Sequence, residues 1–473
     1  MYKYLLFLIG SFFSMLSFAD DLSAQQKAQA YLQKYETYLY WTLRLPDEPQ
    51  ADFIQFIEPN TPLTHKLREK WLYHLARHHN WALFDLHYRD TDTIGLRCDA
   101  QMAKYQLGQR QEAVQATLPL WLSLDTESST ACQALFAQLQ QDHLLSPTHI
   151  AQRIALALAQ DQPTIAQTLI LQQGKAYTQE LKMLKAIMRD PHQILLLQPG
   201  PIAGALYLYG LKHLVARNID DAINVWQHSR SAALLNADQT QQFLAHLALY
   251  KAIRNQEDAE LWFAKVQPAY CNPNLQDWEI RYALLQKNWK RILQITEATS
   301  LEEGEPFQLY WRARALAKLN QSQAAQAIYR GLATKRHYYG FLASHALHQA
   351  LNFEFEPSIH DLSLLTSYKP ILDHIAEYHR NRQFYLAAHS LNEFSMELSK
   401  PEKNALVYWV SKHLQWYGKA IYLSSQDATL KNELRLRFPL AHRPIIQKLA
   451  NQYQMSAALI YATIRQESSF FLV

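Results

Sequence analysis

Apolar side chains recur three and four residues apart along most of this chain, and short polar turns interrupt them. That spacing gathers the apolar residues on one face of a helix, so each stretch between turns predicts an amphipathic helix. The pairing of a turn with such a stretch recurs at HHNWALFDL (Asn80), LGQRQEAVQA (Gly108), AQDQPTIAQTL (Asp161), ARNIDDAINVW (Asn218), LQKNWKRIL (Asn288), LNQSQAAQAIY (Asn320) and RNRQFYLAAHSL (Asn381). A helical hairpin cannot bury its apolar face alone, so we predict an all-α superhelix of stacked helical hairpins.

The intervals between these turns are unequal, which predicts an irregular superhelix and not an array with a countable repeat. Only 11 of the 473 residues are glycine, and no run of β-branched residues alternates with polar ones. Both features favour helices over strands. The prolines expected at hairpin joints, where a helix has to stop, are Pro46, Pro49, Pro59, Pro62, Pro147, Pro191, Pro199 and Pro201.

Two changes in amino-acid composition along the chain predict domain boundaries. HYYGFLASHAL, residues 337–347, interrupts the alanine-rich hairpins with tyrosines and Gly340, and LRFPLAHRP, residues 436–444, brackets a linker with Pro439 and Pro444. Clusters of Gly, Pro and turn residues between periodic segments mark such boundaries. The predicted order is a superhelical domain at 20–336, a helical linker domain at 337–437 and a further helical segment at 438–473.

The first residues, MYKYLLFLIGSFFSMLSFA (1–19), have a basic residue near the start, an apolar middle and small residues before Asp20. This is the pattern of a cleaved secretory signal peptide, and we expect cleavage after Ala19. The alternative, a membrane-spanning helix, needs about 20 apolar residues, and this run is shorter. The prediction is therefore export to an extracytoplasmic compartment.

The net charge and the cysteines limit the classes of function and the compartments that the sequence supports. The net charge is +4 and no long basic tract is present, so electrostatics does not indicate nucleic acid binding. In an oxidising compartment Cys98 and Cys132 can form a disulfide that closes a loop of moderate length, which leaves Cys271 over. Three buried thiols remain the alternative, because free cysteine also packs as a small apolar residue.

One carboxylate near the end of the chain attracts attention. Helical spacing puts Glu467 on the face that carries Ile460, Thr463 and Ile464. A carboxyl group on an apolar face loses hydration and favours its neutral form, as a general acid requires. Spacing by itself favours the simpler interpretation, a solvated glutamate in the last helical turn, because most helical glutamates are exposed. The neighbouring apolar residues, with Phe470 and Phe471, are expected to form an exposed patch.

The histidines do not form a recognisable metal motif. His74 and His78 are spaced four apart with His79 next to them, but no glutamate follows His74 as the pattern HExxH requires. We expect a solvated helix face and no bound metal. Neither a glycine-rich phosphate loop nor a Gly-x-Ser-x-Gly elbow is present, so no cofactor is predicted.

The segment RFPLAHRPIIQKLANQYQMSAALIYATIRQESSF, residues 437–470, resembles the start of the catalytic domain of the soluble lytic murein transglycosylases. In that family a helix ending in Arg-Gln-Glu-Ser carries the single catalytic glutamate, and the matching residues here are Arg465 to Ser468. The leader, the helical superhelix and the Tyr-Tyr-Gly-Phe-Leu-Ala block at 338–343 fit the same family. The resemblance covers essentially the whole chain.

The resemblance implies a periplasmic, monomeric lytic transglycosylase whose superhelix forms a ring, with peptidoglycan glycan strands as substrate and other cell-wall proteins as partners. Glu467 would protonate the oxygen between N-acetylmuramic acid and N-acetylglucosamine, and would then take the proton of the 6-hydroxyl to close a 1,6-anhydro ring. Ser468 is a weaker candidate for substrate binding. Ordinary glycoside hydrolysis uses two carboxyl groups, so the lack of an acidic partner near Glu467 is no objection.

The sequence departs from the family after Phe470, where a Gly-Leu-Met-Gln stretch and the rest of a lysozyme-like domain are expected. The resemblance therefore implies that 438–473 is a truncated start of that domain, and we expect little or no catalysis because positioning and desolvation both need a groove. The alternative is a non-catalytic helical scaffold that binds glycan strands or cell-wall proteins.

Overall fold

The computed structural model describes residue 26 and residues 29–297, 299–302, 304–353, 361–427, 429–430 and 433–471. Every element in this part of the chain is a helix, so the predicted all-α fold class is confirmed. The predicted signal peptide at 1–19 lies outside the described residues. The described helices include none that is both long and apolar enough to span a membrane.

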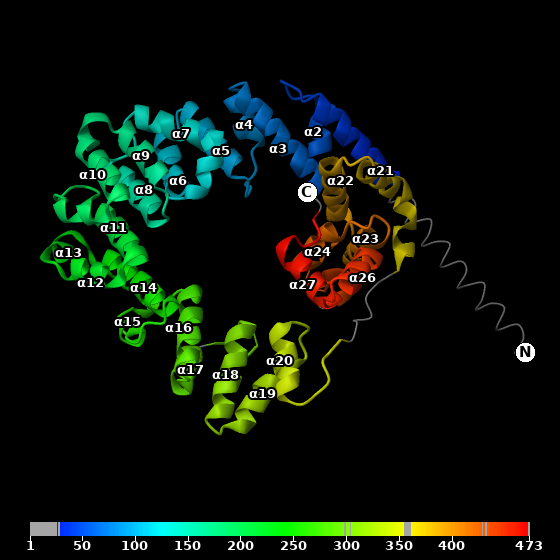
Figure 1. Ribbon diagram of the computed structural model, residues 1–473. Coiled ribbons are helices and arrows are strands. Elements are labelled where there is room, and N and C mark those ends of the chain that lie inside the picture. The colour runs from blue at the N-terminus through cyan, green and yellow to red at the C-terminus, as the bar shows by residue number, and fades with distance from the viewer. Residues whose placement is uncertain are drawn as a thin grey trace, which may run out of the picture. The chain divides into compact units, whose positions relative to one another are not determined.

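The chain divides into two compact units, Leu75–Leu332 and a second unit that joins the residues before Leu75 to those after Leu332. The predicted domain boundaries at 337 and 438 remain predictions. Helices of the first unit appear in Figure 1 as α4 (Trp81–His87), α5 (Ile94–Gln106), α6 (Arg110–Trp121), α7 (Thr130–Gln141), α8 (Pro147–Ala159), α9 (Pro163–Gln172), α10 (Thr178–Arg189), α11 (Ala203–Arg217), α12 (Ile219–Gln227), α13 (Ser229–Leu234), α14 (Ala237–Ile253), α15 (Ala259–Phe263), α16 (Pro273–Leu285), α17 (Trp289–Thr296), α18 (Pro306–Lys318) and α19 (Ser322–Ala333).

The turns between these helices explain why so little glycine is needed. After α3 (Pro62–Arg77), His79 has a φ of 56°, its N–H donates to the Ala76 carbonyl, and the N–H of Asn80 donates to that of Leu75. This pair of bonds closes the helix C-terminus in a Schellman motif. The Asn80 side chain then accepts from the N–H of Leu83 and caps α4. Asp161 has the same left-handed conformation and the same pair of bonds after α8.

The largest described core cluster of this unit runs from Cys98 to Tyr282 with contributions from successive hairpins, and a smaller cluster contains Ala283, Ile292 and Ala315. The largest fully buried members of the larger cluster include Trp121, Tyr207 and Phe243. Full burial of one such side chain stabilises by about 2–3 kcal/mol relative to exposure. Stacking therefore supplies the burial that no hairpin provides alone.

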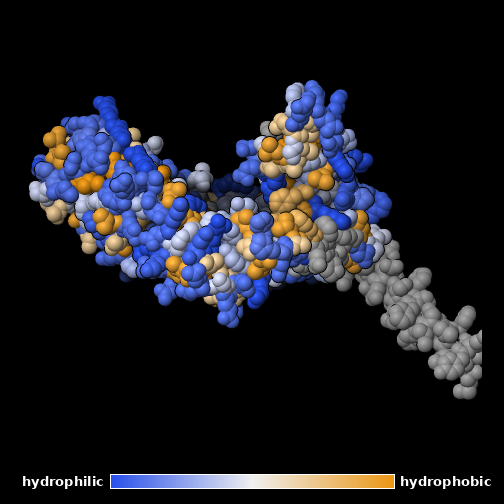
Figure 2. Space-filling model, turned by 60° about the horizontal axis from the view of Figure 1, so that its bottom comes forward, coloured by the Kyte–Doolittle hydropathy of each residue, from blue (hydrophilic) through white to orange (hydrophobic). Residues whose placement is uncertain are grey.

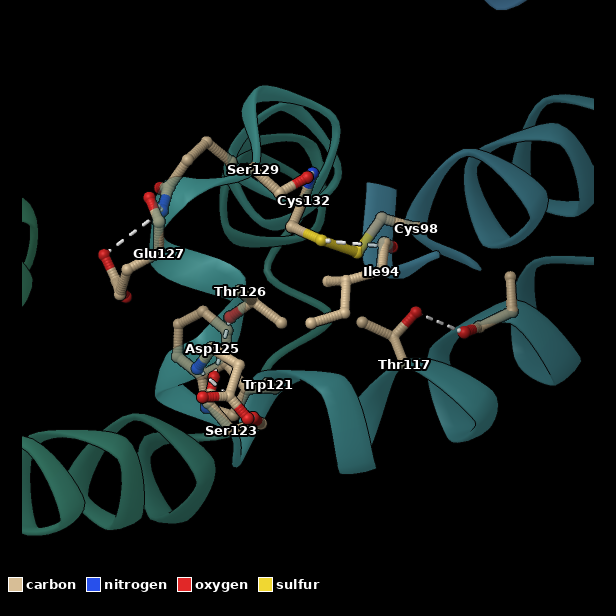
Figure 3. The surroundings of a disulfide bond; sticks show 12 residues. Ile94, Cys98, Thr117, Trp121, Ser123, Asp125, Thr126, Glu127, Ser129 and Cys132 are labelled. Atoms are coloured by element: carbon tan, nitrogen blue, oxygen red, sulfur yellow. Dashed lines mark hydrogen bonds between the residues drawn. A yellow bond between two sulfur atoms is a disulfide. The ribbon is translucent and has the colours of Figure 1, made fainter. Parts of the chain in front are cut away.

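A disulfide joins the first hairpins of this unit. Cys98 on α5 and Cys132 on α7 are bonded, with their Cα atoms 5.0 Å apart (Figure 3). Ser129 begins α7, because its hydroxyl accepts a hydrogen bond from the Cys132 N–H at 3.3 Å. Cys271 is free and half-buried. The cross-link restricts the conformations that the unfolded chain can adopt, which stabilises the folded unit.

The second unit combines the two ends of the chain. Its helices are α2 (Ala51–Ile57), most of α3, α20 (Tyr338–Ala346), α21 (Lys369–Arg380), α22 (Phe384–Glu397), α23 (Lys400–Lys412), α24 (Tyr417–Gln426), α25 (Leu434–Arg437), α26 (Arg443–Gln452) and α27 (Ala457–Glu467). Figure 2 shows one face of the molecule, on which hydrophobic residues are scattered among hydrophilic ones.

Aromatic and charged contacts hold the two ends together. Residues 29–43 are helical, and the Tyr31 ring there lies 5.5 Å from the ring of Phe394 on α22. Glu393, only 3% exposed, forms ion pairs with Lys66 of α3 and, at 3.2 Å, with His389 of its own helix. A buried carboxylate is tolerated only with such partners, so this contact requires both segments.

Candidate active site

The candidate glutamate lies at the end of a helical hairpin formed by α26 and α27. Pro444 occupies the first turn of α26, where its missing N–H is not needed. The chain turns at Gln454, which has a φ of 52°, and the Met455 N–H donates to the Ala450 carbonyl at 2.9 Å. This local closure lets α27 fold back on α26 and run to Glu467.

Side chains of α27 attach the helix to the preceding segment. The Tyr461 hydroxyl donates to the Ala441 carbonyl oxygen at 3.0 Å. The Nε–H of Arg465 donates to the Arg437 carbonyl oxygen at 3.0 Å, and the same guanidinium bonds to the Ser469 hydroxyl at 2.7 Å. Burial, followed by the nearby charge of Arg465, lowers the pKa of Arg437. The charges of Arg437 and Arg465 are therefore close enough to influence one another.

Glu467 is exposed, and no hydrogen bond or ion pair to its carboxylate occurs among the described residues. Thr463 is exposed as well, whereas Ile460 and Ile464 are half-buried. The carboxylate thus lies at the border of the apolar stripe and not within it. Within the described part of the chain, the solvated glutamate that spacing alone favours is what the structure has.

Ser468 directly follows the helix and caps it. Its N–H and its hydroxyl both donate to the Ile464 carbonyl oxygen, at 3.0 and 3.1 Å, and the hydroxyl accepts from the Phe470 N–H at 3.2 Å. These are local bonds of a helix end. Their geometry gives Ser468 a structural part in the turn beside Glu467.

The expected apolar patch at the end of the chain is only partly present. Phe471 is 48% exposed, but Phe470 is half-buried, like Ile460 and Ile464. The close approach of Phe471 to α24 needs a glycine, because a Cβ atom added to Gly418 would lie 2.9 Å from the Phe471 ring. The predicted exposure is therefore confirmed for Phe471 and wrong for Ile460, Ile464 and Phe470, which are half-buried because tertiary packing covers part of each side chain.

The histidines and the tyrosine block singled out in the sequence lie outside the α26–α27 hairpin. The Nε2 of His74 is 2.7 Å from Asp47 Oδ1, so this histidine is paired with a carboxylate. Tyr338 and Tyr339 begin α20, and His337 caps that helix by accepting from the Gly340 N–H at 3.1 Å. Sequence reasoning missed Arg465 as the residue that anchors α27, although its place in the Arg-Gln-Glu-Ser motif was a signal.

Comparison with known proteins supports the resemblance. No protein-family model matches the chain. The soluble lytic murein transglycosylase of Salmonella typhimurium is 21% identical over 457 residues, which cover 93% of this chain and 70% of that protein. Its counterpart from Escherichia coli K12 is 20% identical over 456 residues, with the same coverage of both chains.

Solved structures agree with these relatives. An inactive mutant of the lytic transglycosylase Slt from Pseudomonas aeruginosa superimposes with a TM-score of 0.74 at 22% identity, over 95% of this chain and 75% of that one. The 70 kDa soluble lytic transglycosylase of Escherichia coli gives 0.68 at 19% identity, over 93% and 72% of the two chains. The chain thus has the helical fold of these proteins, and the resemblance inferred from its sequence is confirmed.

Proposed function

We propose that this chain acts on peptidoglycan as a lytic transglycosylase, with Glu467 as its single acid and base. The similarity to soluble lytic murein transglycosylases over 93% of the chain supports the assignment. The observation that carries it is local: Arg465-Gln466-Glu467-Ser468, the pattern that holds the catalytic glutamate in the family the chain resembles, ends α27.

The proposed reaction needs one carboxyl group in two states. The neutral acid donates its proton to the oxygen between N-acetylmuramic acid and N-acetylglucosamine as that glycosidic bond breaks. The carboxylate then accepts the proton of the muramic acid 6-hydroxyl, whose oxygen bonds to C1 and closes the 1,6-anhydro ring. Atoms balance without water or a cofactor. Proton transfer by a positioned group contributes about 10²–10⁴-fold to a rate.

We propose further that turnover by this chain alone is very low. A general acid at neutral pH has to be desolvated, and Glu467 is exposed among the described residues. The same exposure favours the second candidate function, a non-catalytic helical scaffold that binds glycan strands or cell-wall proteins. The proposed location of either is the periplasm, acting as a monomer. The disulfide between Cys98 and Cys132 supports an oxidising compartment.

One experiment separates the two candidate functions. Purified protein is incubated with murein sacculi, and 1,6-anhydro muropeptides are measured by mass spectrometry beside sacculus binding in a pull-down. Catalysis predicts anhydro products that Glu467→Gln abolishes and that Glu377→Gln, the same change at an exposed glutamate of α21, leaves intact. Binding without anhydro product above the Glu467→Gln background would reject the enzyme and support the scaffold.

A further inference from the structure

The unit Leu75–Leu332 contains a cavity, whereas the α26–α27 hairpin belongs to the other unit. The cavity has a volume of about 580 Å³, and it lies where α8, α11 and α14 meet. Gly204 marks how closely two of these helices approach, because a Cβ atom there would lie 2.6 Å from the Gln239 side chain. The start of α11 therefore faces the start of α14. The cavity is a product of hairpin stacking.

Lys212 of α11 contributes a charge to this cavity. Its side chain is half-buried and lines the wall, and it forms no ion pair among the residues that the structure describes. Burial lowers the pKa of this amine, while the charge of Asp161 opposes the shift. Asp161 is itself bonded to His213 at 3.1 Å. A half-buried ammonium group without a paired carboxylate is costly, and an anionic ligand group would offset that cost.

The neighbouring groups leave Lys212 as the positive end of the cavity. Burial lowers the pKa of His246 on α14 to about 4, so this histidine is neutral near pH 7. The cavity also contains Asp238, but its carboxylate accepts from the Tyr270 hydroxyl at 2.7 Å and from the Gln242 amide at 2.8 Å. Asp238 lies near the Gly204 end of α11, which is roughly 12 Å from Lys212 at 1.5 Å per helical residue.

The remaining wall combines amides with small apolar groups. Gln152 carries a donor and an acceptor, whereas Gln239 Oε1 already accepts from the Asn236 N–H and Gln242 Nε2 already donates to Asp238, so these two offer a ligand Gln239 Nε2 and Gln242 Oε1. Small apolar surfaces come from Ala155, Ala159 and Ala205. Amide side chains complement the N–H and C=O of a peptide bond. One ammonium, several amides and small apolar surfaces match the end of a peptide chain that has small side chains.

We propose that this cavity binds the C-terminal carboxylate end of a short peptide with alanine-sized side chains. Lys212 pairs with the carboxylate, the glutamine amides bond to the adjacent peptide group, and the alanines contact the ligand methyl groups. This site functions independently of Glu467. Its assignment to peptides of the cell wall, as opposed to free peptides, rests on the proposed function.

The test uses the full chain and calorimetric titration with N-acetyl-alanyl-alanine, its C-terminal amide and acetate. The free acid should bind at least 10-fold more tightly than the amide. Lys212→Met should weaken the acid at least 10-fold and leave the amide unchanged, whereas Lys212→Arg should retain most of the affinity. Lys185→Met, which removes the same charge from an exposed position of α10, should change nothing. Thermal unfolding of each variant checks that it is folded.

Three results would overturn the proposal: equal binding of acid and amide, full affinity in Lys212→Met, or acetate binding as tight as that of the dipeptide, which would mean a simple anion site. The titration requires no catalysis, so its failure leaves the proposed enzyme untouched. Loss of anhydro products in Glu467→Gln, conversely, does not bear on the cavity. If the free dipeptide binds, sacculi are added as a competitor. Displacement of the dipeptide from the Lys212 site would identify wall-attached peptide as the source of the ligand.

Discussion

Arg465 donates a hydrogen bond from Nε to the backbone carbonyl oxygen of Arg437, 3.0 Å away across 28 residues of chain. The bond fixes the last turn of α27 to the end of α25. The guanidinium also lies 5.8 Å from the centre of the Phe438 ring. The residue two positions before the candidate glutamate thus decides where that glutamate lies.

We expect Arg465→Ala to loosen α27 without unfolding the rest of its unit. A hydrogen bond from a charged group contributes about 1.5–3 kcal/mol, and partial exposure places this one near the lower limit. Amide hydrogen exchange in α27 should accelerate roughly 10-fold. Lys448→Ala, at an exposed lysine of α26, should leave that exchange rate unchanged. Equal protection of α27 in both variants would show that Arg465 is not its anchor.

Loss of the disulfide should destabilise the unit Leu75–Leu332. The bond closes a loop with a sequence separation of 34. The chain-entropy model gives about 4 kcal/mol for such a loop. Urea unfolding of Cys98→Ala/Cys132→Ala should show this loss, while Cys271→Ala should stay near the parent protein. A thiol titration of the unreduced, denatured protein should find one reactive thiol, and three would rule the disulfide out.

Arg153 should be the most sensitive arginine of that unit. It is 1% exposed, donates to the Trp121 carbonyl oxygen and to the Thr126 hydroxyl at 3.2 Å, and forms an ion pair with Glu127. Replacement by Met leaves these acceptors without their donor, which costs about 3–5 kcal/mol. Urea unfolding of Arg153→Met measures that loss. Arg189→Met, at the exposed end of α10, is the matched control and should lose less than about 0.5 kcal/mol.

Stability should also fall below neutral pH because of His246. Burial lowers its folded-state pKa from the ordinary 6.5 to about 4. The unfolded chain then binds more protons than the folded one, so the free energy of unfolding decreases as pH falls from 6.5 towards 4 and changes little above 6.5. The decrease due to this histidine should be roughly 1–3 kcal/mol.

A variant isolates this contribution. His246→Phe should flatten the pH dependence between 4 and 6.5, measured by urea unfolding at several pH values. His143→Asn is the control, because His143 is exposed and its φ of 55° suits asparagine. If the free energy of unfolding of His246→Phe depends on pH as steeply as that of the parent protein, His246 is not the buried, neutral group responsible.

Much of the helical framework was predictable because the information is local. The turns near Asn80, Asp161 and Asn288 combine a residue in the left-handed conformation with closing bonds between groups within five positions. Apolar spacing of three and four identifies the buried face before any partner helix is known. The motif at Arg465 to Ser468 likewise lies inside one helix and its cap, so the sequence alone located the candidate site.

What the sequence by itself determined is therefore the class of fold, the turns and the position of Glu467. Tertiary structure alone decided that residues 29–74 pack with α22 through Lys66 and Glu393, that Glu467 is exposed, and that Lys212 lines a cavity. The physical reason is the sequence distance over which the interactions act. Helix periodicity says which face is buried, whereas the partner of that face depends on contacts between separate helices, such as Lys66 with Glu393 at a sequence separation of 327, which no local pattern encodes.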